Sequence, residues 1–502
     1  MTTEAAPGTL IDLPAQHARD EGSADRLLLA VALSLTVLRF YVAGRTGLVD
    51  DEAYYRIWSL APALSYLDHP PMVAWVIGLG RTLAGDTAFG VRFLAPLSLL
   101  AGAVVLWRTA ALFYGPEFAR RSVYILLAMP LLAVGGIIVT PDLPSVLFGG
   151  LVLWALAELD RSKNANWWLA VGVFAGLGLI SKYTNLFLGA TIVLWLIAVP
   201  ENRRWWRAPQ LWIGGLIAAL ITSPVVIWNA QHGWASFAKQ FGRVAESHGS
   251  VPGAFTAEFV FVFLVLMSPI IGVLAIAGLV HVTRTAISTR RSGDVLLAAA
   301  ILPMLAYFLV HSLHDRVQGN WPSPLYPPLA ICAAIGLETL VAESRRKAVF
   351  RAALGLGFLM TGFIYWHAVS PLMEVRKDPT EQLRGWPALS DAIDAKRREA
   401  GAAWVATSSY ATTGQLFMGL KGRSEVAQLD QRIRYIFLPP LPDELLKQPA
   451  LYVELERRVD LPLLQEKFRK IVPLGDLKRA NGSAGGATYK VFLVADPPAR
   501  PF

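Results

Sequence analysis

Apolar runs long enough to cross a lipid bilayer recur along most of this 502-residue chain. A helix needs about 20 mainly apolar residues to span the hydrocarbon core of a membrane. With 54% hydrophobic and 17% charged residues, the chain is too apolar for one soluble core. We therefore predict an all-α polytopic membrane bundle of about eleven spans. The expected spans are residues 26–45, 88–112, 121–139, 143–159, 165–181, 184–200, 209–228, 255–282, 295–311, 323–342 and 348–369.

Two regions depart from this pattern. Residues 72–80 are apolar but too few to span, and they follow two prolines, which favours an interfacial or re-entrant helix. After residue 370 the composition becomes that of a soluble domain with alternating helix and strand patterns, which predicts a small α/β or α+β module. The expected elements of this module are a helix at 391–398 and strands at 403–407, 435–438, 450–453 and 489–494.

The net charge of +9 comes from short basic clusters between apolar runs rather than from one basic face. This distribution indicates membrane topology, because Lys and Arg collect in cytoplasmic loops, and it gives no support for nucleic-acid binding. The chain then divides into a cytoplasmic tail (1–25), a transmembrane region (26–370) and an external soluble domain (371–502). The basic residues that orient it are Arg120, Arg121, Arg161, Lys163, Arg203, Arg204, Arg207, Arg284, Arg290, Arg291, Arg345, Arg346, Lys347 and Arg351.

Three consecutive carboxylates, Asp50, Asp51 and Glu52, directly follow the first apolar run. Charge at the bilayer boundary is costly and is usually retained for function. A carboxylate at the mouth of an apolar cavity can take a proton from an acceptor hydroxyl or bind a metal ion. Helix capping is the structural alternative, because anions suit helix N-termini. We predict that Asp51 and Glu52 are catalytic and that Asp50 contacts substrate, with a divalent metal possible at the three.

Further charged residues fall on the same inferred face. Asp68 and His69 precede two prolines, and they would form a polar cup if they face Asp51, or else would cap an interfacial helix. Asp142 follows a proline at the end of an apolar run and could complete the cup, although a tight turn is the alternative. Lys182 interrupts two apolar runs, which suits a phosphate ligand better than a snorkelling lysine. We predict Asp142 as catalytic and the others as substrate-binding.

Other polar and aromatic residues of the external loops could bind phosphate or sugar, although aromatic belts at membrane surfaces account for many of them. No paired His or Cys motif supports a zinc site, and no Walker A, Rossmann or nucleophile-elbow motif points to nucleotide cofactors or serine hydrolysis. The single cysteine, Cys332, excludes an intrachain disulfide. The remaining candidate substrate-binding residues are Tyr54, Tyr55, Tyr183, Asn229, Arg243, Arg316, Asn320 and Trp321.

Together these motifs resemble the GT-C integral-membrane glycosyltransferases, specifically family 39 and the related family 83. These families include protein O-mannosyltransferases, lipid A aminoarabinose transferases and rhizobial lipopolysaccharide galacturonosyltransferases. The resemblance covers about residues 30–330. It is carried by DEAYY (51–55), YLDHPP (66–71), PD (141–142), SKYT (181–184), WN (228–229) and NWP (320–322).

The resemblance implies an inverting transfer of a sugar from a polyprenyl-phosphate donor to a hydroxyl or phosphate of lipid A, lipopolysaccharide or another glycan. The reaction would take place on the periplasmic face of a bacterial inner membrane, and membrane lipids would surround the protein. Asp51 falls at the position of the family's catalytic acid, and Lys182 is the nearest match to a phosphate-binding cation. His69 stands where the aminoarabinose transferases have a lysine. No cofactor is required, because the leaving group is already a phosphate, and a divalent metal is optional.

Two alternatives use the same features differently. Protein O-glycosylation would employ the same fold with a protein acceptor. A lipid-linked sugar transporter or flippase would also need an apolar bundle, but such proteins commonly contain internal repeats and helices broken at mid-bilayer. Here the sequence has no internal symmetry and its polar motifs fall on one face. A third interpretation, a scaffold or polymer-export subunit, would not explain the charged residues Asp51 and Lys182.

Overall fold

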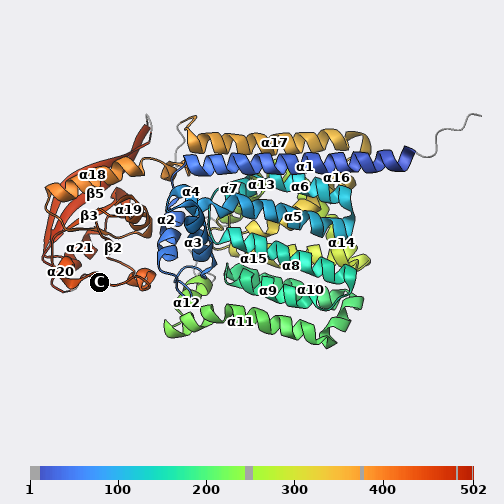
Figure 1. Ribbon diagram of the computed structural model, residues 1–502, viewed down its shortest axis with the longest axis horizontal. Helices are drawn as coiled ribbons and strands as arrows, with labels where there is room; N and C mark the ends of the chain where they lie inside the picture. The colour runs from blue at the N-terminus through green and yellow to red at the C-terminus, as the bar shows by residue number, and fades with distance from the viewer. Residues whose placement is uncertain (1–11, 243–252, 374–377, 482–483, 500, 502) are drawn as a thin grey trace, which may run out of the picture.

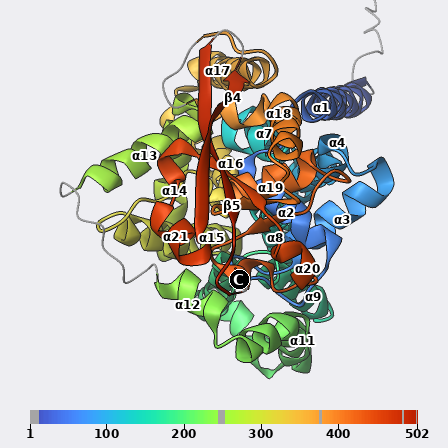
Figure 2. The same ribbon diagram turned by 90° about the vertical axis from the view of Figure 1, so that its left-hand side faces the viewer.

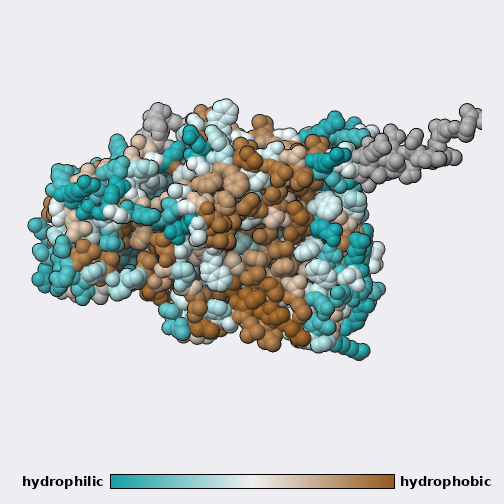
Figure 3. Space-filling view, in the orientation of Figure 1, coloured by the Kyte–Doolittle hydropathy of each residue, from teal (hydrophilic) through white to brown (hydrophobic). Residues whose placement is uncertain are grey.

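The computed structural model describes residues 12–242, 253–373, 378–481, 484–499 and 501. A bundle of helices occupies most of it, and a smaller module that contains a β-sheet lies against one end of the bundle (Figure 1). On the face seen in Figure 3, hydrophobic side chains form a broad band across the bundle, and hydrophilic side chains predominate on the module and at the opposite end. The predicted fold class, an all-α membrane bundle with a small module that mixes helices and strands, is therefore confirmed.

Seven helices of the described residues are long and apolar enough to cross a membrane, or eight if a bent pair at 183–207 forms one span. This number is lower than the expected eleven because other apolar runs form shorter helices, which lie beside the long ones (Figure 1). The long helices are α1 (Asp12–Arg45), α5 (Leu94–Tyr114, preceded by α4, Ala88–Arg92), α8 (Asp142–Ser162), α11 (Pro209–Gln231), α14 (Pro269–Ser288), α15 (Ser292–His311) and α17 (Glu343–Val369). The shorter ones are α6 (Pro116–Ala128), α7 (Pro130–Gly135), α9 (Trp167–Leu179), α10 (Leu186–Ala198), α12 (Ala235–Gly242), α13 (Ala254–Met267) and α16 (Tyr326–Leu340).

Two of the expected continuous spans are broken in the structure. The run at 121–139 divides between α6 and α7, and the run at 255–282 divides between α13 and α14. In both cases a proline starts the second helix, Pro130 or Pro269. Proline has no N–H to donate, and it disfavours the helical conformation of the residue before it. Met129, before Pro130, is accordingly extended, with φ −76° and ψ 118°, whereas Ser268, before Pro269, has a positive φ of 74°.

Helices α2 (Asp50–Leu60) and α3 (Met72–Ala84), with α4, fill the end of the bundle that faces the module (Figure 2). Helix α3 confirms the expected short helix at 72–80. Trp75, Leu79 and Leu83 are 43%, 52% and 61% exposed and follow a spacing of four residues, so they form an apolar stripe along one face of α3. This stripe is suited to lipid contact at the membrane surface.

The module is built on a five-stranded sheet in the order β2-β1-β3-β5-β4. Strands β1 (Trp404–Thr407), β2 (Val426–Gln428) and β3 (Ala450–Leu455) are parallel, whereas β4 (Lys470–Asn481) and β5 (Ala484–Ala495) form an antiparallel hairpin beside β3. Helices α18 (Trp386–Glu399) and α19 (Tyr410–Gly419) share one hydrophobic core with the sheet, and α20 (Asp443–Leu446) and α21 (Leu461–Lys467) share another.

The strand expected at 435–438 is wrong. Residues Arg432–Tyr435 form a 3-10 helix, and Phe437 packs its ring edge-on against Tyr66 at 5.0 Å. This segment therefore leaves the sheet to contact the bundle. Because two prolines follow at 439–440, the segment is also a poor strand.

The module docks on the bundle through α19, which packs against α2. Gly414 permits this approach, because a Cβ at that position would lie 2.8 Å from the backbone nitrogen of Tyr54. Gln415 adds polar contacts, donating to the Leu48 carbonyl at 2.9 Å and to Asp50 Oδ1 at 3.1 Å. The two parts of the chain thus meet on the carboxylate run.

Candidate active site

The first turn of α2 presents Asp50, Asp51 and Glu52 to three different surroundings. Asp51 faces two cavities and accepts a hydrogen bond from the Tyr410 hydroxyl at 3.1 Å on Oδ1. Asp50 lines one of these cavities and also contacts the module, where its backbone N–H donates to Gln382 at 3.0 Å. Successive residues on a helix are rotated by about 100° from one another, so three neighbouring carboxylates point into three different surroundings.

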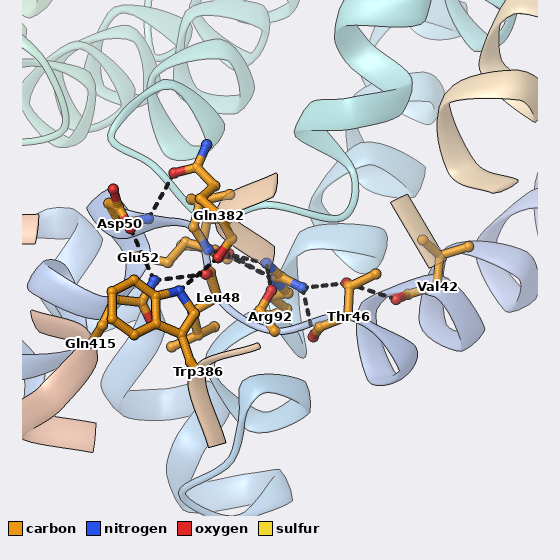
Figure 4. A network of polar contacts seen from close by, with 12 residues as sticks. Val42, Thr46, Leu48, Asp50, Glu52, Arg92, Gln382, Trp386 and Gln415 are labelled. Atoms are coloured by element: carbon orange, nitrogen blue, oxygen red, sulfur yellow. Dashed lines mark hydrogen bonds and ion pairs between the residues drawn. The ribbon is translucent and has the colours of Figure 1, made fainter. Parts of the chain in front are cut away.

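Glu52 is fully buried and lines neither cavity, which argues against its expected catalytic role. The guanidinium of Arg92 binds both of its oxygens, with Nε at 2.8 and 3.0 Å, and also reaches Thr46 (Figure 4). The backbone N–H groups of Val49 and Val139 donate to the same carboxylate at 3.0 and 2.9 Å. Glu52 therefore holds the start of α2 against α4 and the loop before α8, and it has no free oxygen for a substrate.

Two cavities meet at Asp51. The first, of about 420 Å³, runs between α5, α7, α8 and α16 and has mainly apolar walls. The second, of about 510 Å³, runs from the module to α10 and α15 and contains the charged residues Asp68, Lys182 and Arg434. The residues that line both cavities are Asp51, Thr140, Asp142, Gln318, Asn320 and Tyr410.

Asp142 and Lys182 form a buried ion pair in the second cavity, with Nζ to Oδ1 at 2.5 Å. Asn320 donates from Nδ2 to Oδ2 of Asp142 at 2.7 Å, and the Thr140 hydroxyl donates to the same oxygen at 3.2 Å. Asp142 is thereby held at the first turn of α8 beside Asp51. The SKYT and NWP motifs thus converge on the PD motif. The members of the predicted polar cup, Asp51, Asp68, His69 and Asp142, all line this second cavity.

Asp68 organises a second ionic cluster, and it is bound by groups from three parts of the chain. Arg434 of the module pairs with its carboxylate, Lys239 of α12 lies at 2.7 Å, and the Tyr54 hydroxyl donates at 2.9 Å. Burial alone would raise the pKa of Asp68, but Arg434 and Lys239 outweigh burial and hold it below its usual value of 3.8. His69 lines the same cavity, edge-on to Tyr55 at 6.0 Å.

The pKa of Asp51 is shifted in the opposite direction, to about 6. Burial is the main cause, because it disfavours the charged carboxylate, and the neighbouring carboxylates Asp50, Asp68 and Glu52 add to the shift. The hydrogen bond from Tyr410 works against the shift. A carboxylate with this pKa is mostly ionised at neutral pH but is basic enough to accept a proton from a hydroxyl in a transition state.

The structure places some of the predicted substrate-binding residues in the site and others outside it. Tyr54, Tyr55, Tyr183, Asn320 and Trp321 line the second cavity.

Asn229 and Arg316 line neither cavity, contrary to expectation. Asn229 is buried and bonds within its own segment, with Nδ2 donating to Val225 and Oδ1 accepting from the Phe237 N–H. Arg316 is 64% exposed and pairs with Glu258 at 2.7 Å. Arg243 lies outside the described residues.

The sequence prediction missed Tyr410 and Arg434, both from the module, and Lys239. Ser409 is the N-cap of α19, and its hydroxyl accepts from Thr412, which places Tyr410 in the first turn, facing Asp51. No motif marks Tyr410 or Arg434, because their partners are 359 and 366 residues away in the sequence. The docking of α19 on α2 brings Tyr410 into the site, and the segment 432–438, which packs on the bundle through Phe437, brings Arg434.

Metal binding at the carboxylate run is not favoured by the geometry. Within the described ranges, no group of three or more His, Cys, Asp or Glu side chains is arranged to hold a metal ion. A divalent cation needs converging oxygen ligands, whereas Glu52 faces Arg92 and Asp50 faces Gln415.

Comparisons with known proteins agree with the resemblance seen in the motifs. Residues 68–228 match the family model described as dolichyl-phosphate-mannose-protein mannosyltransferase. A lipid A galacturonosyltransferase, RgtD, of Rhizobium johnstonii is 31% identical over 41% of this chain and 43% of its own length. An undecaprenyl phosphate-α-4-amino-4-deoxy-L-arabinose arabinosyl transferase of Edwardsiella ictaluri is 29% identical over 59% of this chain and 54% of its own. The chain thus spans about half the length of these relatives.

The likeness in three dimensions extends further. The crystal structure of ArnT from Cupriavidus metallidurans bound to undecaprenyl phosphate superposes with a TM-score of 0.63 at 16% identity, over 93% of this chain and 97% of that chain. The module and the bundle therefore both belong to the shared fold. The resemblance to the GT-C glycosyltransferases is confirmed.

Proposed function

We propose that this chain, which has the fold and motifs of GT-C membrane glycosyltransferases, is an inverting transferase that uses a polyprenyl-phosphate sugar as donor. The acceptor is a hydroxyl or phosphate of lipid A, lipopolysaccharide or another glycan. The observation that carries the proposal is the meeting of two cavities at Asp51, with the cations Lys182 and Arg434 in one of them and apolar walls in the other.

The second cavity, called the cationic cavity below because Lys182 and Arg434 line it, suits the donor. A third cation, Lys239, lies beside the cavity, where it forms an ion pair with Asp68. These groups now neutralise Asp142 and Asp68, and a phosphate can share them when it binds. The cavity also reaches Leu186 and Phe187 of the bundle, where a polyprenyl chain can follow the apolar surface.

The reaction needs one proton acceptor and one stabilised leaving group. An acceptor hydroxyl oxygen forms a bond to the anomeric carbon as the bond from that carbon to the phosphate oxygen breaks. The hydroxyl proton passes to Asp51, and the electron pair remains on the polyprenyl phosphate, next to Lys182 and Arg434. One displacement inverts the anomeric configuration. Asp142 orients Lys182 and lines both cavities, so it can also contact the acceptor.

The orientation follows from the basic loops. Arg120 pairs with Asp25, and Arg121 and Arg346 pair with Glu338, so basic residues of two loops gather at the end of the bundle where Asp25 of α1 also lies. Lys and Arg collect in cytoplasmic loops, so that end of the bundle is the cytoplasmic one. The site and the module then lie on the periplasmic side of a bacterial inner membrane. A donor carried on a membrane lipid supplies sugar there without a nucleotide.

The name of RgtD gives lipid A as acceptor and a galacturonosyl group, and the name of the Edwardsiella ictaluri relative gives an undecaprenyl-phosphate aminoarabinose donor. These names favour a lipid A acceptor and a uronic acid or aminoarabinose sugar. The match at 68–228 to a mannosyltransferase of proteins supports a protein acceptor as the second candidate. No cofactor is required, so transfer persists in the presence of a chelator such as EDTA.

The test is transfer by the purified full-length chain in lipid nanodiscs, with labelled undecaprenyl-phosphate sugars and with lipid A or a Ser/Thr-rich protein as acceptor. We expect wild type to label lipid A, and Asp51→Asn to lose at least 100-fold in rate, the usual scale for a general base. Asp443→Asn, on an exposed helix of the module, is the matched control. Full activity of Asp51→Asn contradicts the proposed mechanism, and labelling of protein alone selects the second candidate.

A further inference from the structure

His311 is a buried side chain that the proposed mechanism does not use. It is the last residue of α15, only 2% of its surface is exposed, and it lines the cationic cavity. Neither Nδ1 nor Nε2 has a hydrogen-bond partner among the residues that the structure describes. Buried polar groups are nearly always bonded, so a pair of open nitrogens in a cavity wall indicates a ligand contact.

The chemistry of the imidazole restricts that ligand. A neutral imidazole has one N–H donor and one acceptor nitrogen. A phosphate offers acceptors and is better served by the cations Lys182 and Arg434 of the same cavity. A sugar hydroxyl both donates and accepts, so the vicinal hydroxyls of a sugar ring match both nitrogens.

The surroundings of His311 also suit a sugar ring. Its ring lies 6.0 Å from that of Tyr307 at an interplanar angle of 29°, and 5.7 Å from that of Trp321. Aromatic walls with a few placed polar groups are typical of small-ligand sites. Asn320, the neighbour of Trp321, binds Asp142, which binds Lys182. The aromatic group is therefore joined through two polar contacts to the cation assigned to the donor phosphate.

We infer that His311, with Trp321 beside it, binds the glycosyl ring of the donor and contributes to the choice of sugar. The acceptor is less suited to this position, because His311 and Trp321 line the cavity assigned to the donor phosphate and not the other one. This inference rests on the proposed function, since it needs a lipid-phosphate sugar in that cavity.

The test measures binding without turnover, on the full chain in nanodiscs and with no acceptor. The probes are undecaprenyl phosphate alone and a panel of undecaprenyl-phosphate hexoses and pentoses. His311→Phe keeps the ring shape and removes both nitrogens, His311→Asn restores one polar side chain, and His281→Phe, on an exposed part of α14, is the matched control.

For the sugar that wild type prefers, we expect His311→Phe to bind about tenfold more weakly, which is about 1.4 kcal/mol. Binding of bare undecaprenyl phosphate stays within about twofold, and His311→Asn regains part of the loss, as expected from the modest worth of a neutral hydrogen bond. Without ligand, His311→Phe unfolds at the same temperature as wild type or higher, because it no longer buries two open nitrogens.

Several results would overturn the inference. Equal loss for the sugar-bearing and the bare lipid means that His311 serves the phosphate or the fold, and lower thermal stability of His311→Phe points to the fold. Unchanged donor binding with a higher KM for the acceptor assigns His311 to the acceptor. A wild type that prefers no sugar-bearing lipid over the bare one also refutes it. Failure of the proposed mechanism is a separate result, because it is detected by transfer with Asp51→Asn.

Discussion

Tyr410→Phe tests the link between the module and the proposed base. The substitution removes the hydroxyl that donates to Asp51 at 3.1 Å and leaves the ring in place. A hydrogen bond to a charged group is worth about 1.5–3 kcal/mol, and 1.36 kcal/mol corresponds to one pKa unit. Because Asp51 is partly open to the cavities, we take the low end, and we expect its pKa to rise from about 6 to roughly 7.

The sign follows from which form of Asp51 reacts. The ionised carboxylate is the base, so kcat/KM rises with pH through the pKa of Asp51, near 6 in wild type. With the pKa near 7, the ionised fraction at pH 6 falls from about one half to about one tenth, so kcat/KM falls about fivefold there. Above about pH 8.5 both proteins have nearly all of the base ionised, and their rates converge.

The assay is sugar transfer in nanodiscs between pH 5 and 9, with Tyr452→Phe as the control. Tyr452 lies in the same module, but its hydroxyl bonds to Ser408 at 2.7 Å. An acidic limb of Tyr410→Phe that stays near pH 6 or moves lower would refute the reasoning. A loss that is equal at every pH would instead show that Tyr410 supports the structure of the site.

Three further predictions separate structural from chemical roles. Glu52→Ala leaves Arg92 buried without its carboxylate and should destabilise the protein by about 3–5 kcal/mol. Thermal unfolding in detergent measures this loss. An unchanged melting temperature together with lost transfer would instead assign Glu52 a catalytic role. Lys182→Met should raise the donor KM at least tenfold, because it removes one charged contact to the phosphate. Lys182→Arg should be less affected. An unchanged KM would contradict the assignment of Lys182 to the donor. Gly414→Leu should push α19 away from Tyr54 and abolish transfer while the bundle stays folded, seen as faster proteolysis between bundle and module; wild-type activity would show that docking is dispensable.

Much of the bundle could be predicted because membrane insertion depends on local composition. The length of each apolar run indicates a helix within lipid, and the alternation of basic loops indicates its direction. Proline alone does not locate the breaks, because Pro130 and Pro269 start new helices whereas Pro224 and Pro303 lie inside the continuous helices α11 and α15. The strand expected at 435–438 failed because its apolar side chains pack on the bundle and not on the sheet.

For the candidate site, the sequence by itself singled out Asp51, Asp142 and Lys182, since unpaired charge at a bilayer boundary is costly and therefore conspicuous. It could not distinguish Asp51 from Glu52, because adjacent side chains on a helix point about 100° apart and only their surroundings differ. In the structure, Glu52 forms an ion pair with Arg92, whereas Asp51 lines the cavities.

Tertiary structure alone decided what Tyr410 and Arg434 do. Their partners, Asp51 and Asp68, are more than 350 residues away in the chain. Tyr410 reaches Asp51 because Gly414 lets α19 approach α2, and Arg434 reaches Asp68 from the segment 432–438 that packs on the bundle. The sequence thus determined which segments enter the membrane and which charges need an explanation, because those properties are local. The packing of the module on the bundle determined the pKa of the base and the pairing of the cations, because both depend on burial and on neighbours that are distant in sequence.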